Sequence, residues 1–182
     1  MIQRFTFGCP LPTESVVLPV ESAAAAVPYL TAVPDGSWSF SLAEDAVVYG
    51  LGEMPRGINK RGWHYVTDNT DESHHGENRL SYYGAHNFLL IDGGAGRSVF
   101  GVFVDFPGKV FYDIGYTRHD RLTFRTEEPD YDLYILTGDS PNAVCTEFRK
   151  LIGHSYIPPK WAFGFAQSRW GYKTEEDVRE VA

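Results

Sequence analysis

Cysteine is scarce in this sequence of 182 residues, which contains only Cys9 and Cys145. Two cysteines so far apart do not form the disulfide framework that stabilises small secreted domains. Residues 1–7 alternate polar and apolar side chains without the apolar run of a secretory signal, and the alanine run at 23–26 is too short to cross a membrane. We therefore expect two free thiols, a cytoplasmic protein and no membrane partner.

Clusters of basic residues are also lacking, and the formal net charge is −8. An acidic surface repels the phosphate groups of nucleic acids and of anionic membranes. Both are therefore excluded as partners, whereas a neutral ligand such as a sugar is compatible with the charge. The composition is equally compatible with a monomer and with a homo-oligomer.

The chain is too short for a complete (β/α)8 barrel, which needs roughly 200 residues or more. It is long enough for one β-sandwich with a proper core. Aromatic residues make up 15% of the chain and there are 18 glycines, a composition that favours strands and turns. The length and composition indicate one mainly β domain and a fragment of a second.

Strand patterns dominate the chain up to residue 136. Short turns such as Asp92–Gly96 and Pro107–Gly108 separate several of the strand candidates, which indicates antiparallel pairing. The segment at 15–20 is a weaker candidate for an edge strand, because it contains a proline. The clear strand candidates are residues 38–42, 47–51, 87–91, 98–105, 109–114, 121–126 and 131–136.

The pattern changes to helical spacing at Ser140, which can cap a helix with Pro141 in its first turn and Gly153 at its end. The prolines at 158–159 then mark a boundary between a domain at 1–157 and a second segment at 158–182. Residues 161–166 form an apolar run typical of a strand buried on both faces. A capping box at 174–177 opens another helix, so the second segment reads as strand, loop and helix.

The polar stretch at 67–79 has no hydrophobic period and predicts a long loop. Such loops in compact domains are usually functional or disordered. His74 and His75 are adjacent, but they lack the spacing of a metal site, so we expect no metal.

Two other motifs predict ordinary structure. The glycines at 93–96 predict a hairpin turn. The basic cluster Arg56, Lys60 and Arg61 predicts a solvated loop, and Glu53 could form an ion pair with one of its members.

Three segments carry a specific combination of motifs. They are Tyr-Gly-Leu-Gly-Glu at 49–53 with Arg-Gly at 56–57, Asn-Thr-Asp at 69–71 leading to the run at 80–88, and Pro-Pro-Lys-Trp at 158–161 with Gln-Ser-Arg-Trp-Gly-Tyr at 167–172. In order and spacing they resemble glycoside hydrolase family 31, and bacterial α-glucosidases in particular. The resemblance covers roughly residues 47 to 182.

The resemblance implies an antiparallel, galactose-mutarotase-like β-sandwich followed by the first strand and helix of a (β/α)8 barrel. It implies a retaining α-glucosidase that hydrolyses the O-glycosidic bonds of α-glucosides or oligosaccharides without a cofactor. Retention needs two carboxylates about 5–5.5 Å apart. In this family both come from later barrel strands, so we assign no catalytic residue here and expect this chain alone to be inactive.

The family match also implies three substrate-binding residues. Asp71 matches a sandwich-loop carboxylate that accepts hydrogen bonds from sugar hydroxyls. Trp170 matches an aromatic residue at the end of the first barrel strand, where barrel sites lie. Arg169 is a weaker candidate of the same kind, and both Asp71 and Trp170 could instead have a purely structural role.

Two other functions are compatible with the residues. A stand-alone carbohydrate-binding sandwich needs no barrel, but it leaves the apolar run at 161–166 without a purpose. An aldose mutarotase needs a histidine acid and a carboxylate base that face one pocket. His64, His86 and Glu77 are candidates for such a pair, although the sequence shows no clear pairing.

Overall fold

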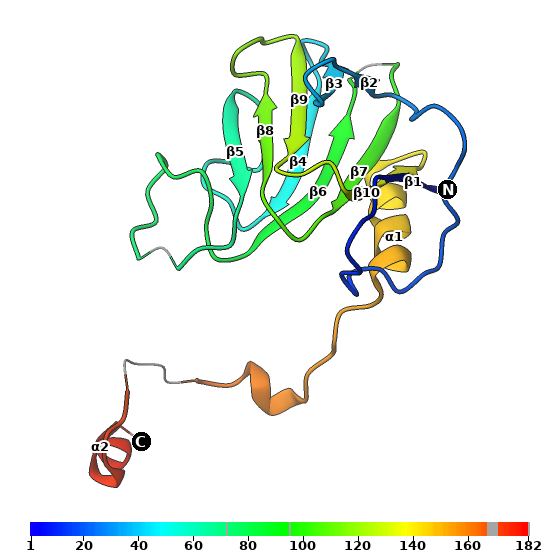
Figure 1. The fold of residues 1–182 in the computed structure, drawn as a ribbon. Helices are drawn as coiled ribbons and strands as arrows, with labels where there is room; N and C mark the ends of the chain where they lie inside the picture. Colours follow the sequence, from blue (N-terminus) through cyan, green and yellow to red (C-terminus); the bar gives the residue numbers. More distant parts are fainter. Residues whose placement is uncertain (72, 95, 167–170, 182) are drawn as a thin grey trace.

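The chain folds into two antiparallel sheets packed face to face, with a helix on the outer side of one sheet (Figure 1). The computed structural model describes residues 1–71, 73–94, 96–166 and 171–181. Each sheet has five strands among these residues. The predicted sandwich is therefore confirmed.

The first sheet has the spatial order β1-β10-β7-β6-β4, and every neighbouring pair is antiparallel. Its middle strands are apolar on both faces, because one face meets the second sheet and the other meets the helix. The strands are β1 (Ile2–Phe7), β10 (Tyr131–Thr137), β7 (Val99–Asp105), β6 (Ala85–Asp92) and β4 (Val47–Gly52).

The second sheet has the order β2-β3-β9-β8-β5. Its strands alternate buried and partly exposed residues, because only one face is covered. The strands are β2 (Thr31–Ala32), β3 (Trp38–Ser41), β9 (Arg121–Thr126), β8 (Val110–Ile114) and β5 (Trp63–Thr67).

A bulge in β4 shows why the Gly-Leu-Gly motif is needed there. The register shifts between Gly50 and Gly52, and Leu51 between them is fully buried. A Cβ on Gly50 would lie 2.1 Å from the carbonyl oxygen of Phe88 on the next strand. Only glycine lets the two strands approach so closely.

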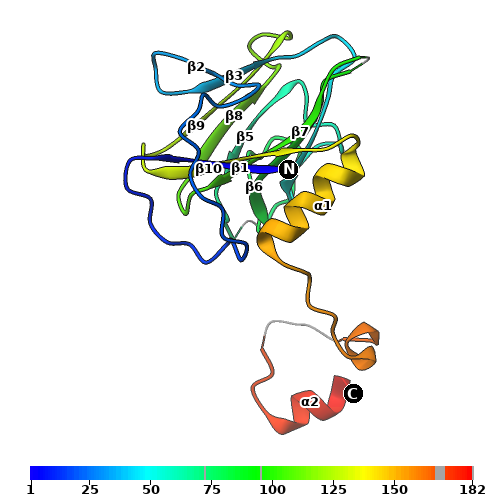
Figure 2. The ribbon, with the colours of Figure 1, turned by 90° about the vertical axis from the view of Figure 1, so that its right-hand side faces the viewer.

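Helix α1 (Pro141–Ile152) covers the outer face of the first sheet (Figure 2). The Ser140 hydroxyl accepts a hydrogen bond from the Ala143 amide at 3.2 Å, and Gly153 follows the last turn, as predicted. Val144 and Leu151 are fully buried against the sheet. Cys145 faces solvent, and Cys9 is also a free thiol.

The N-terminal third differs from the predictions. The pattern at 2–7 did not predict β1, and β5 fell outside the predicted strands. The segment at 15–20 is not a strand; its Val17 and Leu18 amides instead donate to the Leu151 carbonyl at 2.9 and 3.2 Å. These bonds satisfy a backbone acceptor at the helix C-terminus, which the helix itself leaves free.

The expected strand at 161–166 is also absent, because residues Lys160–Phe163 form a 3-10 helix, η1. A strand needs a neighbour to accept and donate its backbone hydrogen bonds, and no described strand lies beside this segment. The expected second helix is present as α2 (Glu175–Val181), and the Thr174 hydroxyl accepts from the Asp177 amide at 3.2 Å as the capping box predicted. The described part of the tail extends away from the sandwich (Figures 1 and 2).

Candidate functional site

The long loop between β5 and β6, residues 68–84, projects from one end of the sandwich (Figure 1). Its first residue, Asp68, forms an ion pair with Lys109 of the neighbouring turn at 3.0 Å. The Asp68 amide donates to the Ser81 hydroxyl at 3.2 Å, and the Thr70 amide donates to the Tyr82 carbonyl at 3.3 Å. The two limbs of the loop are therefore tied to each other and to the second sheet.

Tyr82 braces the far part of the same loop. Its side chain is buried, and its hydroxyl donates to the Gly76 carbonyl at 3.0 Å. The His75 ring lies 4.9 Å from the Tyr82 ring and 5.3 Å from the Tyr83 ring. The loop thus has a packed interior of its own, as functional surface loops often have.

Asp71 is exposed on this loop, one residue beyond the Thr70 bond. Its carboxylate is free to meet a ligand from outside the sandwich. Among the described residues, no group of three or more histidine, cysteine or acidic side chains could hold a metal ion. Arg169 and Trp170 lie outside the described residues.

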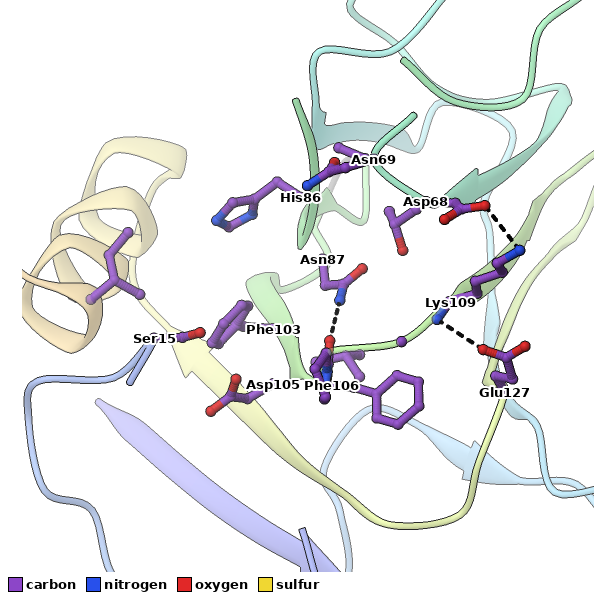
Figure 3. A pocket seen from close by; sticks show the side chains of 16 residues that line it. Ser15, Asp68, Asn69, His86, Asn87, Phe103, Asp105, Phe106, Lys109 and Glu127 are labelled. Atoms are coloured by element: carbon purple, nitrogen blue, oxygen red, sulfur yellow. Dashed lines mark hydrogen bonds and ion pairs between the residues drawn. The ribbon is translucent and has the colours of Figure 1, made fainter. Parts of the chain in front are cut away.

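A hollow of about 700 Å³ opens beside the base of the loop (Figure 3). Asp68, Asn69, His86 and Lys109 line it together with residues of β7 and the turn after it. Asp71 is not among its lining residues, although Asn69 of the same motif is. The sequence did not single out Asp105 and Asn87, because strand pairing alone brings them to this end of the sheet.

Burial controls the charges in this hollow. It lowers the pKa of His86, whose ring stacks on Phe103 at 5.8 Å, because burial disfavours the charged imidazolium. It raises the pKa of Asp105, even though the Thr13 hydroxyl donates to that carboxylate at 2.5 Å. Asn87 donates to the Phe106 carbonyl at 3.2 Å, while its own side-chain oxygen is buried without a partner.

The basic cluster beside the loop is structural, which corrects the prediction of a solvated loop. Arg61 donates four hydrogen bonds to backbone carbonyls of Ala43, Glu44, Ala46 and His119. Lys60 is only 5% exposed, and burial lowers its pKa.

Arg56 is the third member of this cluster. It lies over the Trp63 ring at 4.2 Å and donates to the His64 carbonyl at 3.0 Å. Within the described residues no ion pair joins Glu53 to the cluster. The three cations therefore hold loops and strands together.

The histidine and carboxylate pair that the sequence did not find is His64 with Asp113. The His64 Nε2 atom lies 3.1 Å from Asp113 Oδ2, and the two residues face each other across β5 and β8. Asp113 also accepts from the Tyr116 and Thr117 amides. Because the two groups contact each other directly, they leave no space for a sugar between them.

The geometry defines a class of protein first. A sandwich of two five-stranded antiparallel sheets, with a long loop at one end and a helix leading to a separate C-terminal segment, is the galactose mutarotase-like domain. Residues 25–113 match the family model described as "Glycosyl hydrolase 31 N-terminal galactose mutarotase-like domain". Residues 155–182 match the model described as "Glycosyl hydrolases family 31 TIM-barrel domain". The chain belongs to glycoside hydrolase family 31.

Similar proteins agree with this family. The chain is 35% identical over 136 residues to alpha-glucosidase 2 of Bacillus thermoamyloliquefaciens, covering 74% of this chain and 17% of the relative. It is 33% identical over 140 residues to human intestinal sucrase-isomaltase, covering 74% of this chain and 7% of the relative. The chain thus spans a small part of the length of these relatives.

A solved structure shows the same fold. The GH31 dextranase of Flavobacterium johnsoniae, in a complex with isomaltotriose, superposes with a TM-score of 0.71 at 26% identity. The match covers 86% of this chain and 19% of that protein. None of the described helices is both long enough and apolar enough to span a membrane.

Proposed function

We propose that this chain is the N-terminal portion of a retaining α-glucosidase that hydrolyses the O-glycosidic bonds of α-glucosides. The observation that carries the proposal is the succession, in one chain, of the two family 31 domains. Relatives named as α-glucosidases support the activity, and a neighbour that holds isomaltotriose supports an oligosaccharide substrate.

The two carboxylates of a retaining mechanism have to lie about 5–5.5 Å apart. We assign them to later barrel strands outside this chain, and we assign no catalytic residue within it. This chain would therefore supply substrate binding only. It would be inactive by itself, and it would need no cofactor.

Asp71 is the sandwich residue that we propose for binding. Its loop is anchored at both limbs, by the Asp68–Lys109 pair and by Tyr82, while the Asp71 carboxylate stays exposed. A fixed carboxylate can accept charge-assisted hydrogen bonds from two sugar hydroxyls. Trp170 would stack on a pyranose ring, and Arg169 would assist it; both remain proposals from the family motif.

We also propose the domain division at 1–157 and 158–182. The sandwich closes with α1, and the described residues after Gly153 contribute nothing to its two hydrophobic clusters. Trp161, Phe163 and Phe165 are 74–90% exposed, which is unusual for large apolar side chains. Barrel strands would cover such a segment in the whole enzyme.

An assay with an aryl α-glucoside tests the proposal. The 182-residue chain should give no turnover, whereas the protein that includes a complete barrel should release the aryl alcohol with retention at the anomeric carbon. Turnover by the 182-residue chain would refute the assignment of the catalytic carboxylates. Inversion by the complete enzyme would refute the retaining mechanism.

Asp71→Asn in the complete enzyme tests the role of the loop. Loss of a charged acceptor should raise KM by about tenfold or more, since hydrogen bonds to charged groups contribute about 1.5–3 kcal/mol. The matched control is Asp139→Asn, another exposed carboxylate, which should leave KM unchanged. Equal KM values for the two variants would remove Asp71 from the site.

A mutarotase function remains the second candidate, because His86 and Asp105 line one hollow and burial shifts their pKa values in opposite directions. A histidine and a carboxylate that face one pocket are the two groups that such acid–base chemistry needs. Polarimetry on freshly dissolved α-glucose tests this candidate. If residues 1–157 do not accelerate the exchange between anomers, the mutarotase function is refuted.

The stand-alone binding sandwich is tested by calorimetry. If residues 1–157 alone bind an oligosaccharide, that function is favoured.

A further inference from the structure

A second hollow, of about 610 Å³, lies at the edge of the second sheet, where the short strand β2 and the strand β3 meet the residues that open β7. It shares no lining residue with the hollow at the base of the long loop. Its lining includes Arg97, Arg121 and four serine and threonine residues, Thr31, Ser39, Ser41 and Ser98. The family function described above makes no use of it.

The charge of this hollow is opposite to that of the protein. The chain carries a net charge of −8, yet two arginines and no acidic residue line the hollow. Neither arginine forms an ion pair with a described residue, and the Arg121 Nε atom is buried without a hydrogen-bond partner. The carboxylate next to Arg121 in the chain, Asp120, is held by two hydrogen bonds from Arg118.

Arg121 is the principal cation of the site. It pairs with Ser41 across β9 and β3, so its position is fixed by a sheet. Arg97 also borders a neighbouring hollow that contains Asp139, and it is exposed. The Arg121 Nε atom is closed off from solvent and therefore from a ligand, but the terminal nitrogens of this guanidinium are not among the buried unpaired atoms of the described residues and can meet an anionic ligand in the hollow.

An aromatic wall completes the hollow. Tyr29 stacks on Phe100 with ring centroids 4.3 Å apart and planes 14° from parallel, and its side chain is 40% exposed. The backbone of Tyr29 has φ of 65°, a left-handed conformation that is strained for a residue with a Cβ. The stack thus holds a strained residue in place with part of its ring facing outward.

We propose that this hollow binds a small phosphate monoester. The Arg121 guanidinium can donate two parallel hydrogen bonds to a phosphoryl group, and the hydroxyls nearby can donate further bonds. The volume is far larger than a phosphate ion needs, and the Tyr29 ring offers a surface for the carbon part of the ligand. The acidic remainder of the protein repels a nucleic acid backbone.

Calorimetry on the 182-residue chain at constant ionic strength tests the proposal with phenyl phosphate, glucose 6-phosphate, inorganic phosphate and glucose. Both monoesters should bind at one site, at least threefold more tightly than inorganic phosphate, and they should still bind when glucose is present in excess. Absence of saturable binding would overturn the site. Equal affinity for the monoesters and inorganic phosphate would overturn the monoester assignment.

Variants locate the binding. Arg121→Gln should weaken phenyl phosphate at least tenfold, and Arg121→Lys should weaken it less, because lysine keeps the charge but loses the planar fork. Lys173→Gln, which removes an equal charge from the tail, should have no effect. Equal losses in Arg121→Gln and Lys173→Gln would show unspecific attraction and overturn the proposal.

A measurement on the unaltered chain covers the case in which Arg121→Gln does not fold. Phenylglyoxal modifies accessible guanidinium groups, and peptide mass spectrometry reports which arginines react. Saturating phenyl phosphate should slow modification of Arg97 and Arg121 at least fivefold and leave Arg149 unprotected. Equal protection of all three would contradict the site.

Discussion

Trp38 and Tyr131 join the two sheets through a buried hydrogen bond, in which the Trp38 Nε1 atom donates to the Tyr131 hydroxyl at 2.7 Å. Trp38 lies on β3 of the second sheet and Tyr131 opens β10 of the first. The Phe7 ring packs on both, with centroid distances of 5.5 and 5.0 Å. This contact fixes the two sheets to each other, although the two residues lie 93 positions apart in the sequence.

Tyr131→Phe should lower the free energy of unfolding by about 1–3 kcal/mol, because it leaves the buried indole N–H without an acceptor. Urea unfolding followed by tryptophan fluorescence measures the change. Tyr116→Phe removes a hydroxyl from a residue that is 54% exposed, and it should change the stability by less than about 0.5 kcal/mol. Similar losses in both variants would show that the hydrogen bond between the sheets contributes nothing.

His86 should make the sandwich less stable in mild acid. Burial lowers the pKa of His86 in the folded state, so the unfolded chain binds the proton more readily. Stability should therefore fall as the pH decreases below about 6.5, the ordinary pKa of histidine, and level off below the folded-state pKa. Urea titrations between pH 5 and 7.5 measure this slope.

His86→Phe keeps a ring against Phe103 and Phe148 and should remove that slope. His119→Gln removes an imidazole from the surface and should keep it. Asp105 should change the stability in the opposite sense and at lower pH. Because burial raises its pKa in the folded state, its contribution to the free energy of unfolding declines as the pH rises from about 3.8 through the folded-state pKa. A slope that persists in His86→Phe would assign the pH dependence to another group.

Ser140→Ala should destabilise the chain by about 1 kcal/mol, since the hydroxyl satisfies the Ala143 amide at the start of α1. Ser140→Asp keeps an acceptor and should retain most of the stability. Chemical denaturation monitored by circular dichroism gives both values. An unchanged midpoint in Ser140→Ala would mean that the tertiary contacts of Val144 and Leu151 alone define the helix.

Removal of residues 158–182 should leave the thermal midpoint of the sandwich within about 2 °C, because the described tail adds nothing to its hydrophobic clusters. The full 182-residue chain should associate as its concentration rises, since Trp161, Phe163 and Phe165 expose large apolar surfaces, and the truncated chain should not. Calorimetry and light scattering measure the two effects.

The matched variant replaces Trp161, Phe163 and Phe165 together by serine in the full 182-residue chain. It should lose association as the truncated chain does, although its length is unchanged. A drop of more than about 10 °C in the midpoint on truncation would contradict the domain division at residue 157.

Local patterns in the sequence were sufficient for much of this fold. The turn glycines, the strand patterns of β8, β9 and β10 and the period of α1 between Ser140 and Gly153 each predicted an element that the structure contains. The motif at 158–172 predicted the family, because it places several large and unusual side chains at fixed spacing. These signals depend only on residues near one another in the chain.

Tertiary structure decided the remainder. Strand β5 exists because it pairs with β8 more than 40 residues away, and Arg61 is structural because four backbone carbonyls surround it. The segment at 161–166 has the composition of a buried strand, but it does not form a strand. The backbone groups of a strand need hydrogen-bond partners on a neighbouring strand, which these residues cannot provide themselves. The cationic hollow around Arg121 likewise results from sheet pairing, which brings residues together that no local pattern connects.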